Sequence, residues 1–434
     1  MAREMKDSGI PWIGVIPDSW EIKRLKEVFV ECKEKSLDGA GELLSLSQYT
    51  GVQQKKDTDK AGTHESETYE GYNVVHKGQL VMNIMLAWNG SYAISDYDGI
   101  ISPAYCVFDF RIDCAKRYFH YLLRTNGYPS AFKTLSRGII DSRLRLYPEQ
   151  FYTFPTVLPP LSTQQRIADF LDRKCAEIDE LAALQETMIE ELKHYKQSLI
   201  TETVTKGLDK NAKMKPSGVE WIGEIPEGWV VLPFKQMYQL GKGLSITKAD
   251  LVEQGVPVVS YGQIHSKSNT GTTIKDELIR YVPTSFLENS KDALVKIGDV
   301  IFADTSEDLE GCGNCIYVDR DMTLFAGYHT IIASNRSGSF SRYLPYLFKT
   351  DCWRMQIRAV VNGVKLFSVP QKTLAATSII LPPLYEQQQI ADYLDRKCAE
   401  IDELIAIKQQ KIEALKEYKK SVIFEYVTGK KEVE

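Results

Sequence analysis

The chain repeats itself once, and this internal repeat limits the folds that it can adopt more than any other feature. Met5–Trp20 recurs as Met214–Trp229 at an offset of 209 (214 minus 5), and Leu158–Gly207 recurs as Leu381–Lys430 at an offset of 223 (381 minus 158). The second match has 32 identities in 50 positions, whereas the stretches between the matches share only scattered features. Solenoid units have periods of roughly 20–50 residues, much shorter than these offsets. We therefore expect two copies of one module, each with an entry segment, a variable domain and a shared segment.

Each shared segment is predicted to be a long helix. Residues 163–205 and 386–428 contain no proline or glycine and consist mostly of strong helix formers. The Leu-Pro-Pro-Leu that precedes each of them cannot be helix interior, so Ser162 or Thr163 is the predicted N-cap of the first helix. Uninterrupted helices of this length, about 60 Å each, are typical of a coiled coil. We expect the two helices to pair antiparallel within one chain, with the variable domains at opposite ends.

A heptad pattern predicts which side chains form the helix contact. One core position is assigned to Leu171, Ile178, Leu192 and Leu199, repeated as Leu394, Ile401, Leu415 and Val422, and the other to Leu181, Met188 and Tyr195, repeated as Leu404 and Tyr418. Polar side chains interrupt this pattern at Gln185, Lys408 and Lys411. They either flank a broader apolar stripe that Ala182, Ile189, Ile405 and Ile412 complete, or they fix the register of two unlike helices.

The variable domains are predicted to be mixed α and β. Apolar or alternating runs predict strands at 43–46, 80–84, 104–110, 256–260, 299–303 and 329–333, and helices are expected near 116–126 and 340–350. The fold class is therefore α+β: two mixed α/β domains, two long helices in an intramolecular antiparallel coiled coil, and a pseudo-twofold repeat.

The overall charge argues mildly against nucleic-acid binding, but the local charge does not. The chain has 53 Lys and Arg against 58 Asp and Glu, a net charge of -5. Residues 111–147 hold eight basic side chains and two acidic ones, and residues 334–370 hold six and one, so the local charges are +6 and +5. Basic helix faces are often simply solvated. Recurrence at matching places in two dissimilar copies nevertheless favours phosphate contact.

The sequence contains no motif that indicates catalysis. Cys312 and Cys315 form a CxxC without the second pair that a zinc site needs, Gly241-Lys242-Gly243 lacks the rest of a phosphate-binding loop, and the six histidines are scattered. Met1–Lys6 leads into no signal-peptide core, and eight cysteines are too few for a disulfide scaffold. We therefore expect reduced thiols, a cytoplasmic location, no metal and no enzymatic activity.

These features together resemble the specificity (S) subunit of a type I restriction–modification system. The similarity rests on the two entry segments, on Leu-Pro-Pro-Leu-x-x-Gln-Gln followed by Ile-Ala-Asp-x-Leu-Asp in both copies, on Val204–Asp209, and on Lys296–Phe302. They occur in the family's order over nearly the whole chain.

The resemblance implies a DNA-reading subunit with target-recognition domains at 1–157 and at 208–380 (with a connector), and spacer helices at 158–207 and 381–434. Each domain would read one half of an asymmetric, bipartite double-stranded DNA target. Two modification (methyltransferase) subunits and two restriction subunits would dock on it. S-adenosylmethionine, ATP and Mg²⁺ are expected on those partners and no cofactor on this chain.

Base contacts are expected from side chains of types that pair with base edges, in two loops and two segments of the variable domains. The candidates are Gln48, Gln53 and Lys55; Arg137, Arg143 and Arg145; Tyr261, Gln263 and Lys267; and Arg358, Asn362 and Lys365. Arg143 and Arg145 could instead hold only phosphates. Two alternatives stay open: a non-enzymatic coiled-coil scaffold whose variable domains bind a protein or a carbohydrate, and a recognition half split from a fused restriction enzyme.

Overall fold

A computed structural model of the chain describes residues 3–48, 50–55, 68–140, 143–336, 342–363 and 365–433. The chain divides into two compact units. The first unit contains residues 1–186 and 409–434, and the second contains residues 187–408. The first unit is therefore assembled from both ends of the sequence, whereas the second is continuous.

The first unit is built on a four-stranded antiparallel sheet in the order β4-β11-β8-β9. Its strands are β4 (Phe29–Cys32), β11 (Tyr105–Phe110), β8 (Leu80–Asn83) and β9 (Tyr92–Ile94). Pairs surround it: β1 (Met5–Asp7) with β2 (Val15–Pro17), β3 (Glu21–Arg24) with β12 (Pro155–Leu158), β5 (Leu44–Ser47) with β6 (Gly51–Gln54), and β7 (Asn73–Val75) with β10 (Gly99–Ile101). The helices are α1 (Leu25–Val28), α2 (Lys116–Leu123), α3 (Gly127–Leu135), α4 (Pro148–Phe151) and the 3-10 turn η2 (Ala87–Asn89).

The second unit repeats this plan with one additional sheet. The equivalent sheet has the order β16-β24-β20-β22, made of β16 (Tyr238–Lys242), β24 (Thr330–Asn335), β20 (Val300–Ala303) and β22 (Cys315–Tyr317). The additional sheet, β18-β17-β23-β19, contains the parallel pair of β17 (Val256–Val259) and β23 (Leu324–Ala326), flanked by β18 (Arg280–Val282) and β19 (Leu294–Val295). The remaining pairs are β13 (Met214–Pro216) with β14 (Glu224–Pro226), β15 (Val230–Pro233) with β26 (Ser378–Leu381), and β21 (Thr305–Ser306) with β25 (Phe367–Ser368).

The helices of the second unit follow the order of those in the first. They are α6 (Phe234–Met237), α7 (Tyr261–Ile264), α8 (Phe286–Asn289), α9 (Tyr343–Phe348), α10 (Asp351–Arg358) and α11 (Gln371–Ala376), with 3-10 turns η4 (Lys248–Asp250), η5 (Asp276–Leu278) and η6 (Lys291–Ala293). The six predicted strands are confirmed, and the predicted helices are confirmed as α2 and α9. Phe340, at the start of the second predicted helix, lies outside the described residues.

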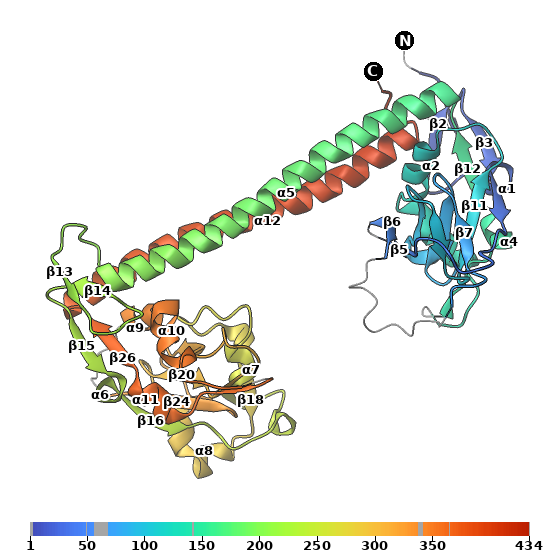
Figure 1. Cartoon of the computed structure of the whole chain (residues 1–434). Helices are drawn as coiled ribbons and strands as arrows, with labels where there is room; N and C mark the ends of the chain where they lie inside the picture. Colours follow the sequence, from blue (N-terminus) through green and yellow to red (C-terminus); the bar gives the residue numbers. More distant parts are fainter. Residues whose placement is uncertain are drawn as a thin grey trace. The chain divides into compact units, whose positions relative to one another are not determined.

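Both predicted long helices are present, and they pair antiparallel within each unit. They are α5 (Leu161–Lys206) and α12 (Leu384–Val427). In the first unit, the Phe170 and Tyr426 rings pack against each other, with 4.4 Å between centroids, and Lys419 pairs with Asp179 at 2.6 Å. In the second, Lys196 pairs with Asp402 at 2.6 Å. Figure 1 shows α5 and α12 lying side by side. The predicted N-cap is wrong, because α5 already begins at Leu161, directly after the two prolines.

The predicted register of the helix contact is wrong at one of its two core positions. Leu181, Met188, Tyr195, Leu404 and Tyr418, which the heptad assigned to the contact, are exposed. The second core position lies one residue later, and its buried members are Cys175, Ile189, Cys398 and Ile412. Gln185 is also buried, so the contact includes a polar side chain, whereas Leu181 and Leu404 face outward. Side-chain hydrophobicity alone misassigned the register, because the buried face is set by what the helices pack against.

Each variable domain is attached to a long helix by an equivalent tyrosine hydrogen bond. Buried Tyr118 donates its hydroxyl to the carbonyl of Val427 at 2.9 Å, and buried Tyr343 donates to Val204 at 2.8 Å. Val204 and Val427 are equivalent positions, since 427 minus 204 equals 223. The last carbonyls of a helix have no donor within the helix, so these hydroxyls satisfy groups that would otherwise be unpaired. The domain from each half of the sequence therefore completes the end of the helix from the other half.

Candidate nucleic-acid interface

The loop at 137–145 is a narrow hairpin with an exposed basic surface. Arg137 and Arg145 form a β-bridge in which each backbone N–H donates to the other residue's carbonyl at 2.9 Å. Arg137 and Arg143 are exposed and Arg145 is half-buried. Among the described residues, none of the three guanidinium groups has a hydrogen-bonding or ion-pairing partner. Ile139 beside them is completely exposed (100%), whereas residues 141–142 lie outside the described residues.

The other candidates of the first unit lie on the β5–β6 hairpin. The side chain of Gln53 is exposed on β6, and Lys55 follows it with its backbone N–H donated to Leu43 at 2.8 Å. Gln48 lies at the turn, where its carbonyl accepts a 2.6 Å hydrogen bond from Arg124. Residue 49, within this turn, lies outside the described residues. The sequence predicted a polar loop here, and the structure shows a short hairpin on which Gln53 is exposed and Gln48 and Lys55 are half-buried.

The 261–267 segment of the second unit is less available than predicted. Residues 261–264 form the helical turn α7, in which the side-chain oxygen of Gln263 accepts from the Ser260 N–H at 3.1 Å. The Tyr261 ring packs edge-on against Tyr328, with 5.5 Å between ring centroids. Lys267 is exposed beyond the turn. Of the three candidates in this segment, Lys267 is therefore the one that reaches solvent fully.

The 358–365 segment divides into an inward and an outward part. The side chain of Arg358 is only 11% exposed, because it pairs with Asp351 at 2.8 Å and donates to the Glu310 carbonyl at 2.6 Å. Asn362 and Lys365 are exposed. Gly363 holds the turn between them, since a Cβ there would lie 2.3 Å from the carbonyl of Leu366. Residue 364 lies outside the described residues.

Part of the basic charge in each domain is used internally, through a motif that the sequence analysis missed. Arg117 and Tyr121 both donate to Asp172 of α5, at 2.7 and 2.6 Å. Burial alone would raise the pKa of Asp172, but these two donors hold that pKa below its ordinary value. The basic windows are therefore partly an attachment of the domain to the helix.

The second unit repeats this attachment. Arg342 pairs with Asp395 at 2.7 Å, and Tyr346 donates to the same carboxylate at 2.6 Å. The signal was present in the sequence as Arg-Tyr-x-x-Tyr at 117–121 and 342–346, at an offset of 225 (342 minus 117). The basic windows at 111–147 and 334–370 are 223 residues apart, so this motif does not align between them.

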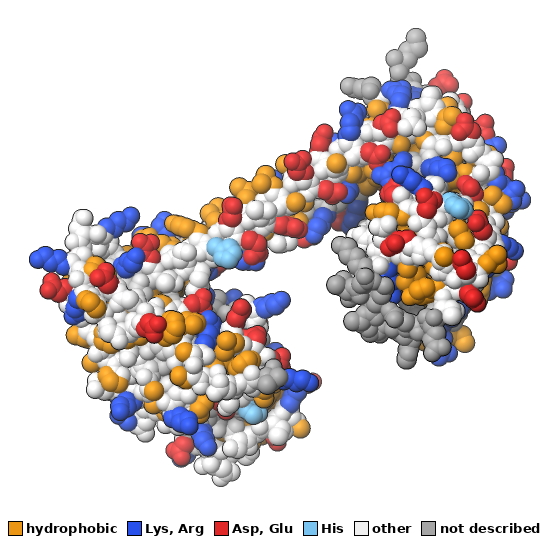
Figure 2. All heavy atoms as spheres, in the orientation of Figure 1, with side chains coloured by type: hydrophobic (Ala, Val, Ile, Leu, Met, Phe, Trp, Pro, Cys, Tyr) orange, Lys and Arg blue, Asp and Glu red, His pale blue; other side chains and the backbone are white. Residues whose placement is uncertain are grey.

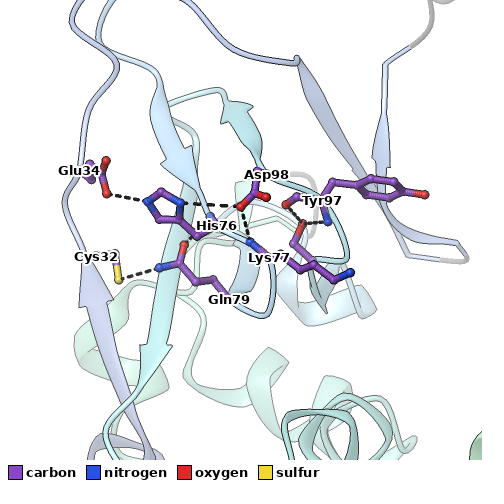
Figure 3. Close-up of polar contacts among 8 residues, drawn as sticks. Cys32, Glu34, His76, Lys77, Gln79, Tyr97 and Asp98 are labelled. Atoms are coloured by element: carbon purple, nitrogen blue, oxygen red, sulfur yellow. Dashed lines mark hydrogen bonds and ion pairs between the residues drawn. The ribbon is translucent and has the colours of Figure 1, made fainter.

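A polar cluster braces the loops beside the main sheet of the first unit (Figure 3). His76 faces two carboxylates, with its Nε2 2.9 Å from Glu34 and its Nδ1 3.8 Å from Asp98. Asp98 also accepts from the Lys77 N–H at 2.9 Å, and Gln79 contacts Cys32. Every polar contact of the His76 ring within the described part of the chain is therefore to a carboxylate. Such contacts hold the segments after β4 and β7 together.

The thiols and the acidic side chains form no metal site in the described ranges. Cys312 and Cys315 lie buried in the core of the second unit, Cys312 in the turn before β22 and Cys315 as the first residue of that strand. Burial raises the pKa of both thiols, that of Cys315 to about 11. No group of three or more His, Cys, Asp or Glu in the described residues is placed to hold a metal ion.

No described helix has the length and apolar character of a membrane span.

The chain matches one protein family along most of its length. The profile described as "Type I restriction modification DNA specificity domain" matches residues 17–194 and 226–417. The chain therefore belongs to the family of type I restriction–modification specificity subunits.

Curated relatives and solved structures agree with this assignment. The type I restriction enzyme MjaVIII specificity subunit of Methanocaldococcus jannaschii is 23% identical, over 96% of this chain and 93% of that protein. The EcoKI specificity subunit of Escherichia coli is 23% identical over 48% of this chain and 44% of that protein. The HsdS crystal structure from Thermoanaerobacter tengcongensis has a TM-score of 0.53 at 16% identity, covering 95% of this chain and 98% of that chain. A type I system structure described by its complex assembly and conformational transition reaches a TM-score of 0.68 at 16% identity and the same coverage.

Proposed function

We propose that this chain recognises an asymmetric, bipartite double-stranded DNA target for a type I restriction–modification complex. The observation that carries the proposal is that the two domains are attached to the helices by equivalent residues but expose different loops. Arg117, Tyr118 and Tyr121 attach the first domain to the helices as Arg342, Tyr343 and Tyr346 attach the second. The hairpins and turns that the domains expose differ in sequence. Two dissimilar reading surfaces on one repeated frame suit a target with two dissimilar halves.

The domain boundaries are part of the same proposal. Residues 1–157 and 208–380, the latter with its connector, would be the target-recognition domains. Residues 158–207 and 381–434 would be the helices that fix the spacing of the two half-sites. Two half-sites read from the same side of B-DNA are separated by about one helical turn, ~34 Å, or by multiples of it.

In the first domain, we propose that the 137–145 hairpin enters a DNA groove. Arg137, Arg143 and Arg145 carry guanidinium groups that no described residue pairs with, and a guanidinium can pair bidentately with guanine or hold a phosphate. The exposed Ile139 beside them supplies an apolar contact of the kind that a thymine methyl group accepts. Gln48, Gln53 and Lys55 would add contacts from the β5–β6 hairpin.

In the second domain, the exposed candidates are Lys267, Asn362 and Lys365. Tyr261 and Gln263 are half-buried and engaged with neighbouring groups, so their contribution to base contact would be smaller. Arg358 points inward and pairs with Asp351, so it would not contact base edges.

Exposed apolar side chains on the long helices are proposed as the docking sites of the modification subunits. The first unit exposes Leu181, Leu184 and Tyr418, and the second exposes their repeat equivalents Leu404, Ile407 and Tyr195, each between 47% and 58%. Figure 2 shows apolar side chains interspersed with charged ones along these helices. Apolar patches rimmed by charge are typical of protein interfaces. One patch in each unit supports two modification subunits for each chain.

We propose that the chain itself is non-catalytic. Methylation with S-adenosylmethionine would reside on the modification subunits, and ATP-driven translocation and cleavage, with Mg²⁺, on two restriction subunits. The chain would direct those partners to the same DNA sequence.

The test is methylome sequencing of cells that carry the chain with its modification partner. A bipartite methyladenine motif should depend on this chain. Exchanging residues 21–157 for another target-recognition domain should change one half of that motif and leave the other half and the spacer unchanged. The matched control exchanges residues 230–380, which should alter only the opposite half. Absence of a chain-dependent motif, or a change in both halves after one exchange, would contradict the proposal.

A further inference from the structure

The second unit contains a polar pocket in which basic side chains lack counter-charges. Its volume is about 360 Å³, and it lies between α10, the end of α5 and the turns at 264–271 and 310–315. Pockets that bind small molecules begin at roughly 300 Å³. Its lining includes Lys349, Arg354 and Arg358, with the acidic residues Asp351 and Glu310. Three cations thus face two carboxylates.

The pairing of these charges leaves two cations unopposed. Asp351 forms an ion pair with Arg358 at 2.8 Å. Glu310 is an exposed residue, and its backbone carbonyl accepts a hydrogen bond from Arg358. Arg354 donates its Nε to the Phe348 carbonyl at 2.9 Å and pairs with no carboxylate in the described residues. The Lys349 ammonium has no hydrogen-bonding or ion-pairing partner among those residues either. The Nε of Arg358 is also buried without an acceptor in the described part of the chain.

At the equivalent position of the first unit, the cation has hydrogen-bond acceptors. Arg124 is the counterpart of Lys349, since 349 minus 124 equals 225, and it lines a cavity beside α3. Its guanidinium donates to the carbonyls of Tyr92 and Gln48, at 3.0 and 2.6 Å. Lys349 has no such acceptors within the described ranges, although both positions are largely desolvated. A buried cation without a partner is costly unless a ligand supplies the acceptor.

We propose that this pocket binds a phosphate-type oxyanion through Lys349, Arg354 and Arg358. A tetrahedral oxyanion offers several acceptors at once, which suits an ammonium, a guanidinium and a free Nε–H around one cavity. The phosphate can come from a small phosphorylated molecule or from a DNA phosphodiester. The site does not depend on DNA recognition, because it is defined by unpaired donors within one unit.

The protonation of Lys349 agrees with this geometry. Burial lowers the pKa of Lys349 to about 8. That value includes smaller contributions from Lys196 of α5 and Arg354 of α10, which also lower the pKa, and from Cys398 and Asp402 of α12, which raise it. A bound oxyanion would favour the charged ammonium. Binding should therefore take up protons near pH 8 and weaken as the pH rises above that value.

The test measures thermal unfolding of the full chain in inorganic phosphate against chloride at equal ionic strength. Phosphate should raise the Tm of the wild type in a saturable way. Lys349→Met keeps the stem but removes the charge, and it should weaken phosphate binding by roughly tenfold or more. Lys349→Arg should restore binding. Lys291→Met, at an exposed lysine of the same unit, is the matched control and should bind phosphate as the wild type does.

Two results would overturn the proposal: no saturable effect of phosphate on the wild type, or the same effect in Lys349→Met as in the control. Because Lys349→Met could alter folding, isothermal titration of folded wild type with phosphate provides a second measurement that needs no variant. A duplex-binding arm then identifies the source of the phosphate. Competition between phosphate and duplex, with weaker duplex binding by Lys349→Met, indicates a DNA phosphodiester. Unchanged duplex binding indicates a small phosphorylated ligand. Failure of all duplex binding would count against the proposed function but leave the phosphate titration intact.

Discussion

Replacing Tyr118 or Tyr343 by phenylalanine should loosen the end of one long helix and leave the end of the other unchanged. Both side chains are fully buried (0% exposed), and each hydroxyl donates to a carbonyl at a helix C-terminus. Tyr118→Phe should therefore affect α12 near Val427, and Tyr343→Phe should affect α5 near Val204. The effect should appear on the helix that belongs to the other half of the sequence.

The expected magnitude follows from the loss of a donor to a buried acceptor. Leaving such a carbonyl unsatisfied costs about 1–3 kcal/mol, which increases opening of the helix end by roughly 5- to 150-fold. Tyr343→Phe should have the larger effect, because the Tyr343 hydroxyl also lies 3.2 Å from the Ile380 carbonyl.

Hydrogen exchange followed by mass spectrometry measures this opening locally, without requiring that the whole chain unfold in one step. Exchange should accelerate at residues 424–429 in Tyr118→Phe and at residues 201–207 in Tyr343→Phe. Tyr418→Phe and Tyr195→Phe, at exposed positions of the same helices, are the controls and should change neither end. Equal acceleration at both ends in either variant, or none beyond the controls, would refute the reciprocal attachment.

Three further outcomes are expected. Replacing Arg143 and Arg145 by alanine should weaken duplex binding and make its salt dependence shallower, by about 0.9 in the log–log slope for each phosphate group that the variant no longer neutralises; an unchanged slope removes them from the interface. The pKa of Lys349 falls from 10.5 to about 8 on folding, so the free energy of unfolding should increase as the pH rises from about 8 to 10.5, by at most about 3 kcal/mol. Urea titrations at pH 7.5 and 10 should show a smaller increase in Lys349→Met than in the wild type. Asp395→Asn should cost about 1 kcal/mol, since it weakens the half-exposed pair with Arg342, and added salt should reduce the difference from wild type in urea titrations.

The extent and the antiparallel pairing of the long helices could be predicted, but not the full set of side chains that they bury. A stretch without proline or glycine defined both spans to within two residues at each end. The predicted register was wrong at one core position: Leu181 and Met188 are exposed, whereas Cys175 and Ile189, one residue later in the heptad, are buried. Which face of a helix becomes buried depends on contacts far away in sequence, and a single helix pattern does not contain them.

The candidate interface shows the same limit. Exposed Arg143 and Lys267 were predictable, because polar segments between strands form turns at the surface. Arg358 and Arg117 look equally basic in the sequence, yet each pairs with an acidic side chain of this chain. Asp172, the partner of Arg117, lies 55 residues away, so the repeated Arg-Tyr-x-x-Tyr motif could be found in the sequence but its partner could not.

The reciprocal attachment also bears on how the chain is made. Tyr118 and its acceptor Val427 are separated by 309 residues, so the first unit cannot close until that later segment has been translated. At the usual speed of synthesis this takes roughly 15–60 s. The second unit is continuous and can close earlier. During that interval the apolar surface that α12 later covers around Leu171 is open to chaperones, or to the matching helix of another nascent chain.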